Sequence, residues 1–499
     1  MPTTATDDAF SASRARFEQV CRFMGGEEAT GLTHAELEER LGVQGRELIR
    51  QLYQDHLDLR AATEQRLGAV VDAKTTPRRA VEAGHARSLE TIFGEVGVTR
   101  LAYRRRGEEN LYPADAALNL PTELHSHGLR ELCAIESAKG SFEEATAAIR
   151  RVTGVAIGKR QVEALAVRST VDFEAFYHDT WRDEAAEGDV LVLSADGKGI
   201  VMRPDALRPH TAKAAQKATP KLKTRLSKGE KRNRKRMAEV GAVYDVTPVP
   251  RSPADIIRRG ADDKEDVPAP KAKNKWLTAS VVDDAAVVIS SIFDEAQRRD
   301  PEHRRTWVVL VDGATHQIDC IHAEAKRREV QVHIVVDIVH VLEYLWSSAW
   351  SFFSEGDPAA ENWVADKALG VLEGNASTVA ASIRRKATCL GLDPPARENA
   401  DRCADYLLAK RDYLDYWRAL EQGWPIATGV IEGACRHLVK DRLDLTGARW
   451  GLHGAESVLK LRALRSNGDF EQYFAFHLRQ ERRRVHQSRY ANNALPTAA

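Results

Sequence analysis

Five short apolar runs, each long enough for one β-strand, follow one another between residues 188 and 337. They are DVLVLSA (189–195), MAEVGAVYDVT (237–247), WLTASVVD (276–283), TWVVLVD (306–312) and VHIVVD (332–337). The stretches between the last three runs, DDAAVVISSIFDEAQRR and HQIDCIHAEAKRRE, have helical periodicity. Because strands alternate with helices here, the sequence predicts an α/β fold with a mixed sheet that contains parallel strands.

The segments on either side of this block have other patterns. Leucines recur at helical spacing after Thr33, a predicted N-cap, and residues 88–104 have the composition of a β-hairpin around Gly94 and Gly97. Residues 141–166 predict two helices broken at Gly154, which is compatible with a helix-turn-helix, although any pair of short helices gives that pattern. The predicted regions are a helical N-terminal region (1–85), a hairpin plus helix-turn-helix-like DNA-binding region (86–180), the first part of a catalytic core (188–356), an all-α insertion (357–423), the final core helices (424–480) and a basic flexible tail (481–499).

Composition excludes several classes of protein. The six cysteines are scattered and form no CxxC pair, which argues against a disulfide framework and against a Cys-rich zinc site. No run of 18 apolar residues occurs, so we expect no membrane partner. The first residues carry no basic-then-apolar export signal, so we expect a cytoplasmic protein.

Charge is balanced overall but not locally. The chain has 73 Lys+Arg and 73 Asp+Glu, so its net charge gives no argument for nucleic-acid binding. Between Arg203 and Arg236, however, thirteen basic residues face two acidic ones, a local charge of +11. This insertion (203–236) and the Pro-rich stretch 250–273 are predicted to be poorly ordered. A solvated loop explains such a run, and so does a DNA partner whose counterions are released on binding.

Three of the apolar runs end in an aspartate, at Asp196, Asp312 and Asp337. Ligands of α/β proteins bind at the carboxyl ends of strands, and a bound divalent metal offsets the desolvation of acids there. Each aspartate alone is explained by a turn or an N-cap. The repetition of an apolar run followed by Asp-Gly at Asp196 and Asp312 favours a shared site.

Glu432 is the fourth candidate acid, at the start of a helix in GVIEGACRHLVK. Arg436 and Lys440 follow at i+4 and i+8, so an exposed ion-pair stripe is the alternative explanation. A two-metal site needs about three converging carboxylates that hold two ions roughly 3.5–4 Å apart. Oxygen ligands favour Mg²⁺ and Mn²⁺ over Zn²⁺.

Six motifs together resemble the DDE transposases of bacterial insertion sequences, specifically the ISKra4 family, over residues from about 85 to 480. The motifs are LSADGKGI (193–200), KNKWLTASV (273–281), VVLVDGATHQ (308–317), VHIVVDIVHVLEYLW (332–346), ATGVIEGACRHLVKDRLDLTGARWG (427–451) and VLKLRALRSNG (458–468).

The resemblance implies an RNase H-like core interrupted by the all-α insertion, with Asp196, Asp312 and Glu432 as the acidic triad. Asp196 is expected to bridge two Mg²⁺ ions (Mn²⁺ can substitute), Asp312 to hold one of them, and Glu432 to complete the coordination. An Asp-x-x-His element falls on Asp337 and His340. It is interpreted either as active-site support or as an N-cap with a core-packed histidine.

The predicted function is DNA transposition: metal-dependent cleavage at element ends, then transfer of the 3′-hydroxyl to target DNA. The expected partners are the terminal inverted repeats, target DNA and further copies of the chain, because pairing two DNA ends requires at least a dimer. The predicted DNA contacts are Arg150, Arg151, Lys159, Arg160, Lys198, Lys221, Lys223, Arg225, Lys231, Arg232, Arg234, Lys235, Arg236, Arg436, Lys440, Arg449 and Trp450. Lys198 is alternatively a solvated lysine, and Trp450 a core aromatic.

Three other functions stay open at this point. They are a catalytically silent, transposase-derived DNA-binding protein, an RNase H-like nuclease without strand transfer, and an α/β hydrolase that uses Asp312 and His340. The last leaves the basic insertion and Glu432 unexplained.

Overall fold

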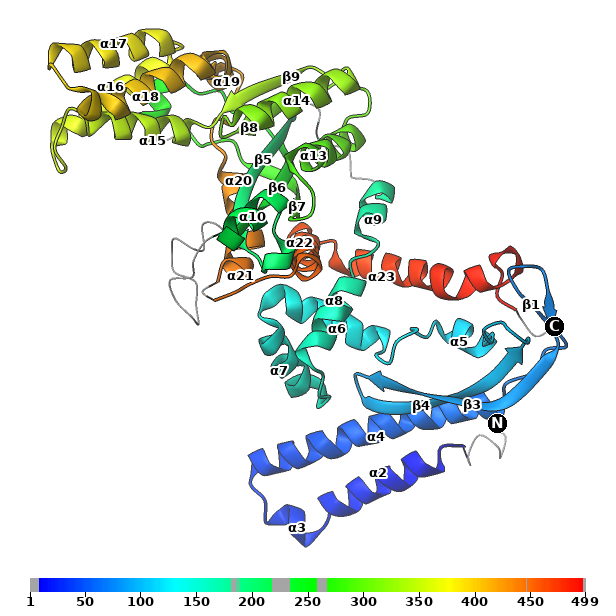
Figure 1. Cartoon of the computed structure of the whole chain (residues 1–499). Helices are drawn as coiled ribbons and strands as arrows, with labels where there is room; N and C mark the ends of the chain where they lie inside the picture. The colour runs from blue at the N-terminus through cyan, green and yellow to red at the C-terminus, as the bar shows by residue number, and fades with distance from the viewer. Residues whose placement is uncertain are drawn as a thin grey trace. The chain divides into compact units, whose positions relative to one another are not determined.

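The structure, a computed structural model, describes residues 9–180, 186, 188–217, 234–257, 267–445 and 447–496. The chain folds into two compact units (Figure 1), of which the first comprises Met1–Asp179 with Gly468–Ala499 and the second Thr180–Asn467. Within the described ranges, no helix combines the length and the apolar character needed to cross a bilayer.

The second unit is built on a five-stranded mixed sheet with the order β7-β6-β5-β8-β9. Its strands are β5 (Val190–Val201), β6 (Lys235–Val246), β7 (Ala272–Ser280), β8 (Trp307–Val311) and β9 (Val332–Val336). β5, β6 and β7 pair antiparallel, whereas β8 and β9 run parallel to β5. The predicted mixed α/β sheet is therefore confirmed, and each predicted apolar run supplies one strand.

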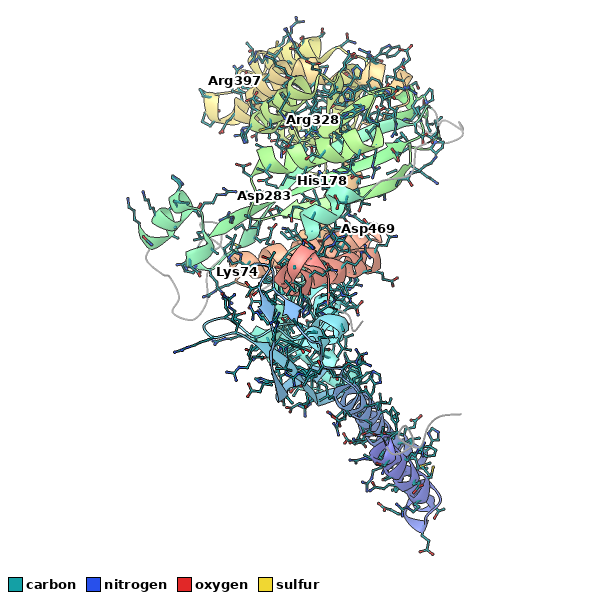
Figure 2. The ribbon with its side chains drawn as sticks, turned by 90° about the vertical axis from the view of Figure 1, so that its right-hand side faces the viewer. Lys74, His178, Asp283, Arg328, Arg397 and Asp469 are labelled. Carbon is teal, nitrogen blue, oxygen red and sulfur yellow. The ribbon has the colours of Figure 1, made fainter. Side chains whose placement is uncertain are left out.

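Helices α13 (Ala285–Arg299) and α14 (Thr315–Arg328) provide the crossovers that parallel strands require. The buried face of α13 carries Ile289, Ile292 and Phe293, and the ring of Phe293 lies 6.0 Å from that of Trp307 on β8. Arg328 of α14, labelled in Figure 2, pairs with Asp294 of α13 at 2.7 Å. Apolar packing and ion pairing thus join the two helices.

The prediction that the first strand ends at Asp196 is wrong, because β5 continues to Val201 and Asp196 lies inside it, opposite Val240. The glycines that suggested a turn make room for side chains of β6. A Cβ at Gly197 would lie 2.9 Å from Cε of Met237 and 3.0 Å from Oε2 of Glu239. The glycines therefore keep the antiparallel pairing intact beyond the aspartate.

The predicted all-α segment is present after the fifth strand. After α15 (Ile338–Ala349), it consists of α16 (Pro358–Leu372), α17 (Ala376–Cys389), α18 (Pro394–Lys410), η2 (Arg411–Tyr413) and α19 (Tyr416–Glu421). The chain then returns to the sheet through α20 (Gly429–Ala434), the π-helix η3 (Cys435–Lys440), α21 (Asp441–Leu443) and α22 (Leu452–Asn467). α20 and η3 pack on β5 and β6, and α22 packs on β7.

The two insertions predicted to be poorly ordered are partly structured. The described part of 203–236 contains η1 (Pro204–Ala206), α10 (Pro209–Lys217) and the first residues of β6. The stretch 250–273 contains α12 (Pro253–Ile256) and the start of β7. β6 begins inside the basic insertion, at Lys235, and a helix lies within it, so this part of the prediction is wrong.

The first unit begins with three helices and a long hairpin. The helices are α2 (Ser11–Met24), α3 (Glu27–Thr30) and α4 (His34–Ala62), and Thr33 caps α4 as predicted. The predicted hairpin forms from β3 (Ala80–Thr91) and β4 (Gly94–Arg104), but it starts earlier than expected, after β1 (Val70–Val71) and β2 (Pro77–Arg78). The predicted helical region 1–85 is therefore helical only to Ala62.

The helix pair around Gly154 is also confirmed. α7 (Phe142–Thr153) ends at Gly154, whose φ of 78° lies in the left-handed region, and α8 (Lys159–Arg168) follows. Both pack on α6 (His127–Lys139) around buried Leu129, Ile149 and Val162. The remaining helices before the chain leaves this unit are α5 (Pro113–Leu118) and α9 (Phe173–Asp179).

The predicted assignment of residues up to 480 to the core, followed by a flexible tail, is wrong. α23 (Phe470–Glu481), η4 (Arg482–His486), η5 (Gln487–Arg489) and η6 (Ala491–Asn493) belong to the first unit. Tyr490 is buried and forms a β-bridge with Asp72. Polar and apolar packing thus anchors the C-terminal segment.

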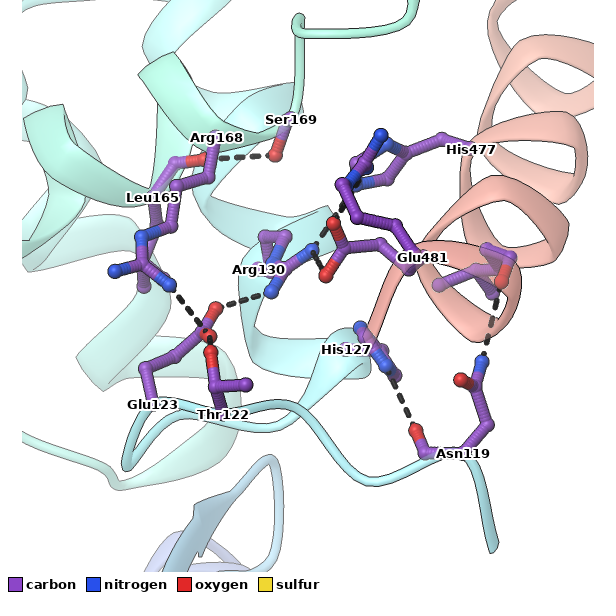
Figure 3. Close-up of polar contacts among 12 residues, drawn as sticks. Asn119, Thr122, Glu123, His127, Arg130, Leu165, Arg168, Ser169, His477 and Glu481 are labelled. Carbon is purple, nitrogen blue, oxygen red and sulfur yellow. Dashed lines mark hydrogen bonds and ion pairs between the residues drawn. The ribbon is translucent and has the colours of Figure 1, made fainter. Parts of the chain in front are cut away.

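A buried ionic cluster holds α23 in the first unit (Figure 3). The Arg130 guanidinium, 0% exposed, pairs with Glu123 and, at 3.1 Å, with Glu481. It also lies 3.0 Å from Nε2 of His477, whose Nδ1 is 2.7 Å from Asp172. Because arginine only donates, Nε2 must accept and Nδ1 carries the proton.

Candidate functional site: three acids around the end of β8

Asp196 and Asp312 each lie two residues beyond the last pair of the parallel strands β5 and β8. Ser194 of β5 lies opposite Leu310 of β8, and continuing this register by two residues sets Asp196 beside Asp312. Neighbouring strands are about 4.8 Å apart, so the two backbone positions are adjacent. Asp312 follows the last residue of β8, whereas Asp196 is held by the antiparallel pairing with β6.

Both carboxylate oxygens of Asp196 accept a hydrogen bond. The Gly197 N–H donates to Oδ1 at 2.6 Å, and the Cys435 thiol donates to Oδ2 at 3.2 Å. Burial, together with the negative charge of Asp196, raises the pKa of the Cys435 thiol, so the thiol keeps its proton and acts as the donor. Asp196 is therefore fixed by its own strand and by the helix that follows Glu432.

Asp312 sits in a tight turn between β8 and α14. Its Oδ1 accepts from the Ala314 N–H at 2.8 Å, and the Tyr406 hydroxyl donates to its carbonyl at 3.2 Å. Gly313 has a φ of 91°, which favours glycine, and a Cβ there would lie 3.1 Å from the Tyr406 oxygen. The second Asp-Gly pair is thus a true turn, in contrast to the first.

Glu432 lies on the exposed side of α20, one helical turn before Cys435. Because residues three apart are neighbours on a helix, the Cys435–Asp196 contact brings the backbone of Glu432 close to Asp196 on β5. Arg436 pairs with Asp441, at 3.9 Å, rather than with Glu432. The exposed Glu432 side chain is free to take other rotamers in this position.

Asp337 and His340 do not act together in the structure. Asp337 is fully buried, caps α15 through the Val339 N–H at 2.9 Å, and accepts a short hydrogen bond from the Thr428 hydroxyl. Thr428 is the N-cap of α20, so Asp337 fixes the start of the helix that carries Glu432. His340 is half-buried and pairs with Glu343 at 3.2 Å, so the predicted core packing of this histidine is wrong.

This placement gives a first prediction. Asp337→Ala is expected to lower the free energy of unfolding of the second unit by about 2–3 kcal/mol, because it removes an N-cap and leaves the Thr428 hydroxyl buried without an acceptor. His340→Ala is expected to change it by less than about 0.5 kcal/mol, because its ion-pair partner Glu343 is 68% exposed and the pair is screened by solvent. Urea denaturation of the two variants checks this, and equal losses would contradict the assigned roles.

Glu239 is an acid near the site that the sequence alone did not reveal. It lies on β6 opposite Gly197, and burial, followed by the negative charge of Asp196, raises the pKa of its carboxyl. Nothing in MAEVGAVYDVT distinguishes this glutamate from a solvated strand residue. Only the pairing of β6 with β5 brings it beside Asp196.

The donor set suits Mg²⁺ by chemistry, because it consists of carboxylate oxygens on adjacent backbone positions. Among the described residues, no group of three or more His, Cys, Asp or Glu side chains is already gathered to hold a metal ion. Joint coordination therefore requires a rotamer change, and the exposed Glu432 is the acid free to make it.

Apart from Trp450, the predicted DNA-contact residues fall into three groups. Those with exposed side chains are Arg150, Arg151, Lys159, Arg160, Arg436, Lys440 and Arg449, and those half-buried are Lys198, Arg234, Lys235 and Arg236. Burial raises the pKa of the Cys435 thiol. The positive charge of Lys198 lies close enough to lower that pKa, but its effect is smaller than that of burial. Lys221, Lys223, Arg225, Lys231 and Arg232 lie outside the described residues.

Two of the predicted contacts are corrected by the structure. Trp450 is 6% exposed, its indole N–H donates to the Leu443 carbonyl at 3.0 Å, and Arg442 stacks on its ring at 4.6 Å. It is a core aromatic and presents no face to a base. The Arg236 guanidinium donates to the carbonyls of Val281 and Val282 at the end of β7, which makes it a structural residue.

Compared with known proteins, the sequence matches no protein-family model and no curated protein.

Proposed function

We propose that this chain is a DNA transposase of the DDE type, with an RNase H-like core that the helices α16–α19 interrupt. The observation that carries the proposal is the position of the acids: Asp196 and Asp312 each lie two residues beyond the last pair of the parallel strands β5 and β8, and the Cys435 contact ties the Glu432 helix to Asp196. The motif resemblance to the ISKra4 family supplies the reaction class.

The topology supports this proposal. The core that the resemblance implies needs a mixed sheet with acids on two neighbouring strands and a third acid on a helix after an all-α insertion. The order β7-β6-β5-β8-β9, with α16–α19 between β9 and α20, meets that requirement.

In the proposed reaction, Asp196, Asp312 and Glu432 hold Mg²⁺, which, when bound, supplies charge stabilisation at the phosphodiester and activates the attacking oxygen. The other residues of the site orient the carboxylates and bind DNA. The hydrogen bonds from Gly197 and Cys435 hold the Asp196 carboxylate, and the turn at Gly313 sets Asp312 at the edge of the sheet. Lys198, two residues after Asp196 on the same face of β5, is available to a DNA phosphate.

The structure disfavours one alternative. An α/β hydrolase would need His340 beside Asp312, but the imidazole of His340 pairs with Glu343 on its own helix. A nuclease without joining activity would keep the same acids, whereas a silent DNA-binding protein would be free to lose them. Activity separates both from a transposase.

The experiment uses the DNA that flanks the gene. We expect inverted repeats there, and we expect the purified chain with Mg²⁺ to nick a duplex that carries one repeat and then to join its 3′-hydroxyl to a second duplex. Nicking without joined product would indicate a nuclease. Binding without nicking would indicate a silent DNA-binding protein.

A second prediction concerns the basic insertion. α10 exposes Lys213 and Lys217, and Lys213→Gln/Lys217→Gln is expected to reduce the salt slope of duplex binding by up to about 2, since each lost phosphate contact reduces it by about 1. Lys326→Gln/Lys367→Gln, which removes the same charge from α14 and α16, serves as the control. Equal slopes in the two double variants would mean that α10 is only a solvated segment.

A further inference from the structure

The geometry points to Cys435 as a positioning residue that orients the Asp196 carboxylate and fixes the Glu432 helix against β5. This inference rests on the proposed function. It concerns a side chain that is neither one of the three acids nor exposed to solvent, since Cys435 is 5% exposed.

The first step of the argument is the hydrogen bonding of Asp196. Oδ1 accepts a hydrogen bond from the adjacent Gly197 N–H, and this bond restrains the side chain only relative to β5. The thiol of Cys435 reaches Oδ2 at 3.2 Å from a segment 239 residues further along the chain. Of the two donors, only Cys435 therefore relates the carboxylate to another element.

The second step is the backbone around Cys435. It is the first residue of the π-helix η3, which follows α20 without a break. π turns are rare and change which side chains face a neighbouring element. Cys435, Leu438 and Val439 are buried in η3, whereas Glu432, Gly433 and Arg436 are exposed. The thiol thus faces the sheet while the preceding turn presents Glu432 outward.

The third step joins these contacts. The Thr428 hydroxyl bonds Asp337 at the start of α20, and the Cys435 thiol bonds Asp196 at its end. Glu432 lies between these two attachments. Loss of the thiol removes the polar contact at the end of α20, and it leaves Asp196 Oδ2 without the donor that orients it.

The test separates positioning from packing with two substitutions and one control. Cys435→Ala removes the donor, Cys435→Ser retains a donor, and Cys403→Ala removes a buried thiol from α18 in the same unit. Mn²⁺ binding, followed by electron paramagnetic resonance of the free ion without DNA, gives a readout independent of activity. The Mg²⁺ dependence of nicking gives the second readout.

We expect Cys435→Ala to weaken Mn²⁺ binding and to raise the half-saturating Mg²⁺ concentration by about five- to tenfold, the effect of one hydrogen bond of ordinary strength, because a thiol is a weak donor. The maximal nicking rate should fall less. Cys435→Ser should recover most of the loss, and Cys403→Ala should match the wild type in both readouts.

Three results overturn the inference. If Cys435→Ala binds Mn²⁺ as tightly as the wild type, and the wild type nicks DNA normally, the inference about Cys435 is overturned and the proposed function stands. A serine variant as weak as the alanine variant shows that the thiol acts through packing. A wild-type chain that binds no Mn²⁺ and does not nick overturns the proposed function, and this inference with it.

Discussion

Changing Asp196 or Asp312 to asparagine is expected to lower Mg²⁺-dependent nicking by at least about 10³-fold. An amide retains the shape of the side chain but removes the charge that holds the metal, and the metal contributes several kcal/mol to the stabilisation of the transition state. Glu432→Gln should have an effect of the same order. Single-turnover nicking of a labelled duplex measures all three variants.

The control for these variants is Asp319→Asn, which removes one charge from an exposed position on α14. Duplex binding should persist in every variant, because phosphate contacts by basic residues dominate DNA affinity. Wild-type nicking by Glu432→Gln would remove that residue from the site. Loss of binding together with nicking would show that the acids maintain the fold instead.

The second large effect is expected in the first unit, at Arg130. Arg130→Met leaves the carboxylates of Glu123 and Glu481 without their most buried partner, and removing one member of a buried pair costs about 3–5 kcal/mol. Hydrogen exchange of the amides of α6 and α23 measures this loss, because those helices carry Arg130 and Glu481.

The matched control is Arg168→Met. Arg168 pairs with the same Glu123 at 2.7 Å, but its side chain is 51% exposed, so its loss should change the stability by less than about 1 kcal/mol. Equal protection losses in the two variants would mean that burial of Arg130 adds nothing.

The cluster also holds Asp172. Burial would raise the pKa of its carboxyl, but hydrogen bonds from His477 and Arg484 outweigh this effect and lower that pKa to about 2.

The strands and most helices could be predicted because their patterns are local. Apolar runs of strand length, the Thr33 cap and the glycine break at Gly154 each depend on residues within a few positions. The first strand was predicted too short because Asp196-Gly197 has the composition of a turn. Whether such a pair turns depends on the neighbouring strand, and here Met237 and Glu239 occupy the space that a Cβ at Gly197 would fill.

Contacts across long sequence separations could not be predicted. The Cys435 thiol, Glu239 and the bond between Thr428 and Asp337 reach the site only through strand pairing and helix packing. The return of residues 468–499 to the first unit depends on contacts of His477 with Arg130 and Asp172. These two residues lie 347 and 305 positions earlier in the sequence. The same holds for Trp450, which forms a β-bridge with Met202, 248 positions earlier in the chain.

The most direct test of a shared metal site is anomalous scattering from crystals of the full chain soaked in Mn²⁺. We predict a difference peak bound by the carboxylates of Asp196 and Asp312, with Glu432 turned toward it from α20. A peak elsewhere on the chain, or none at these carboxylates at a saturating Mn²⁺ concentration, would contradict the account.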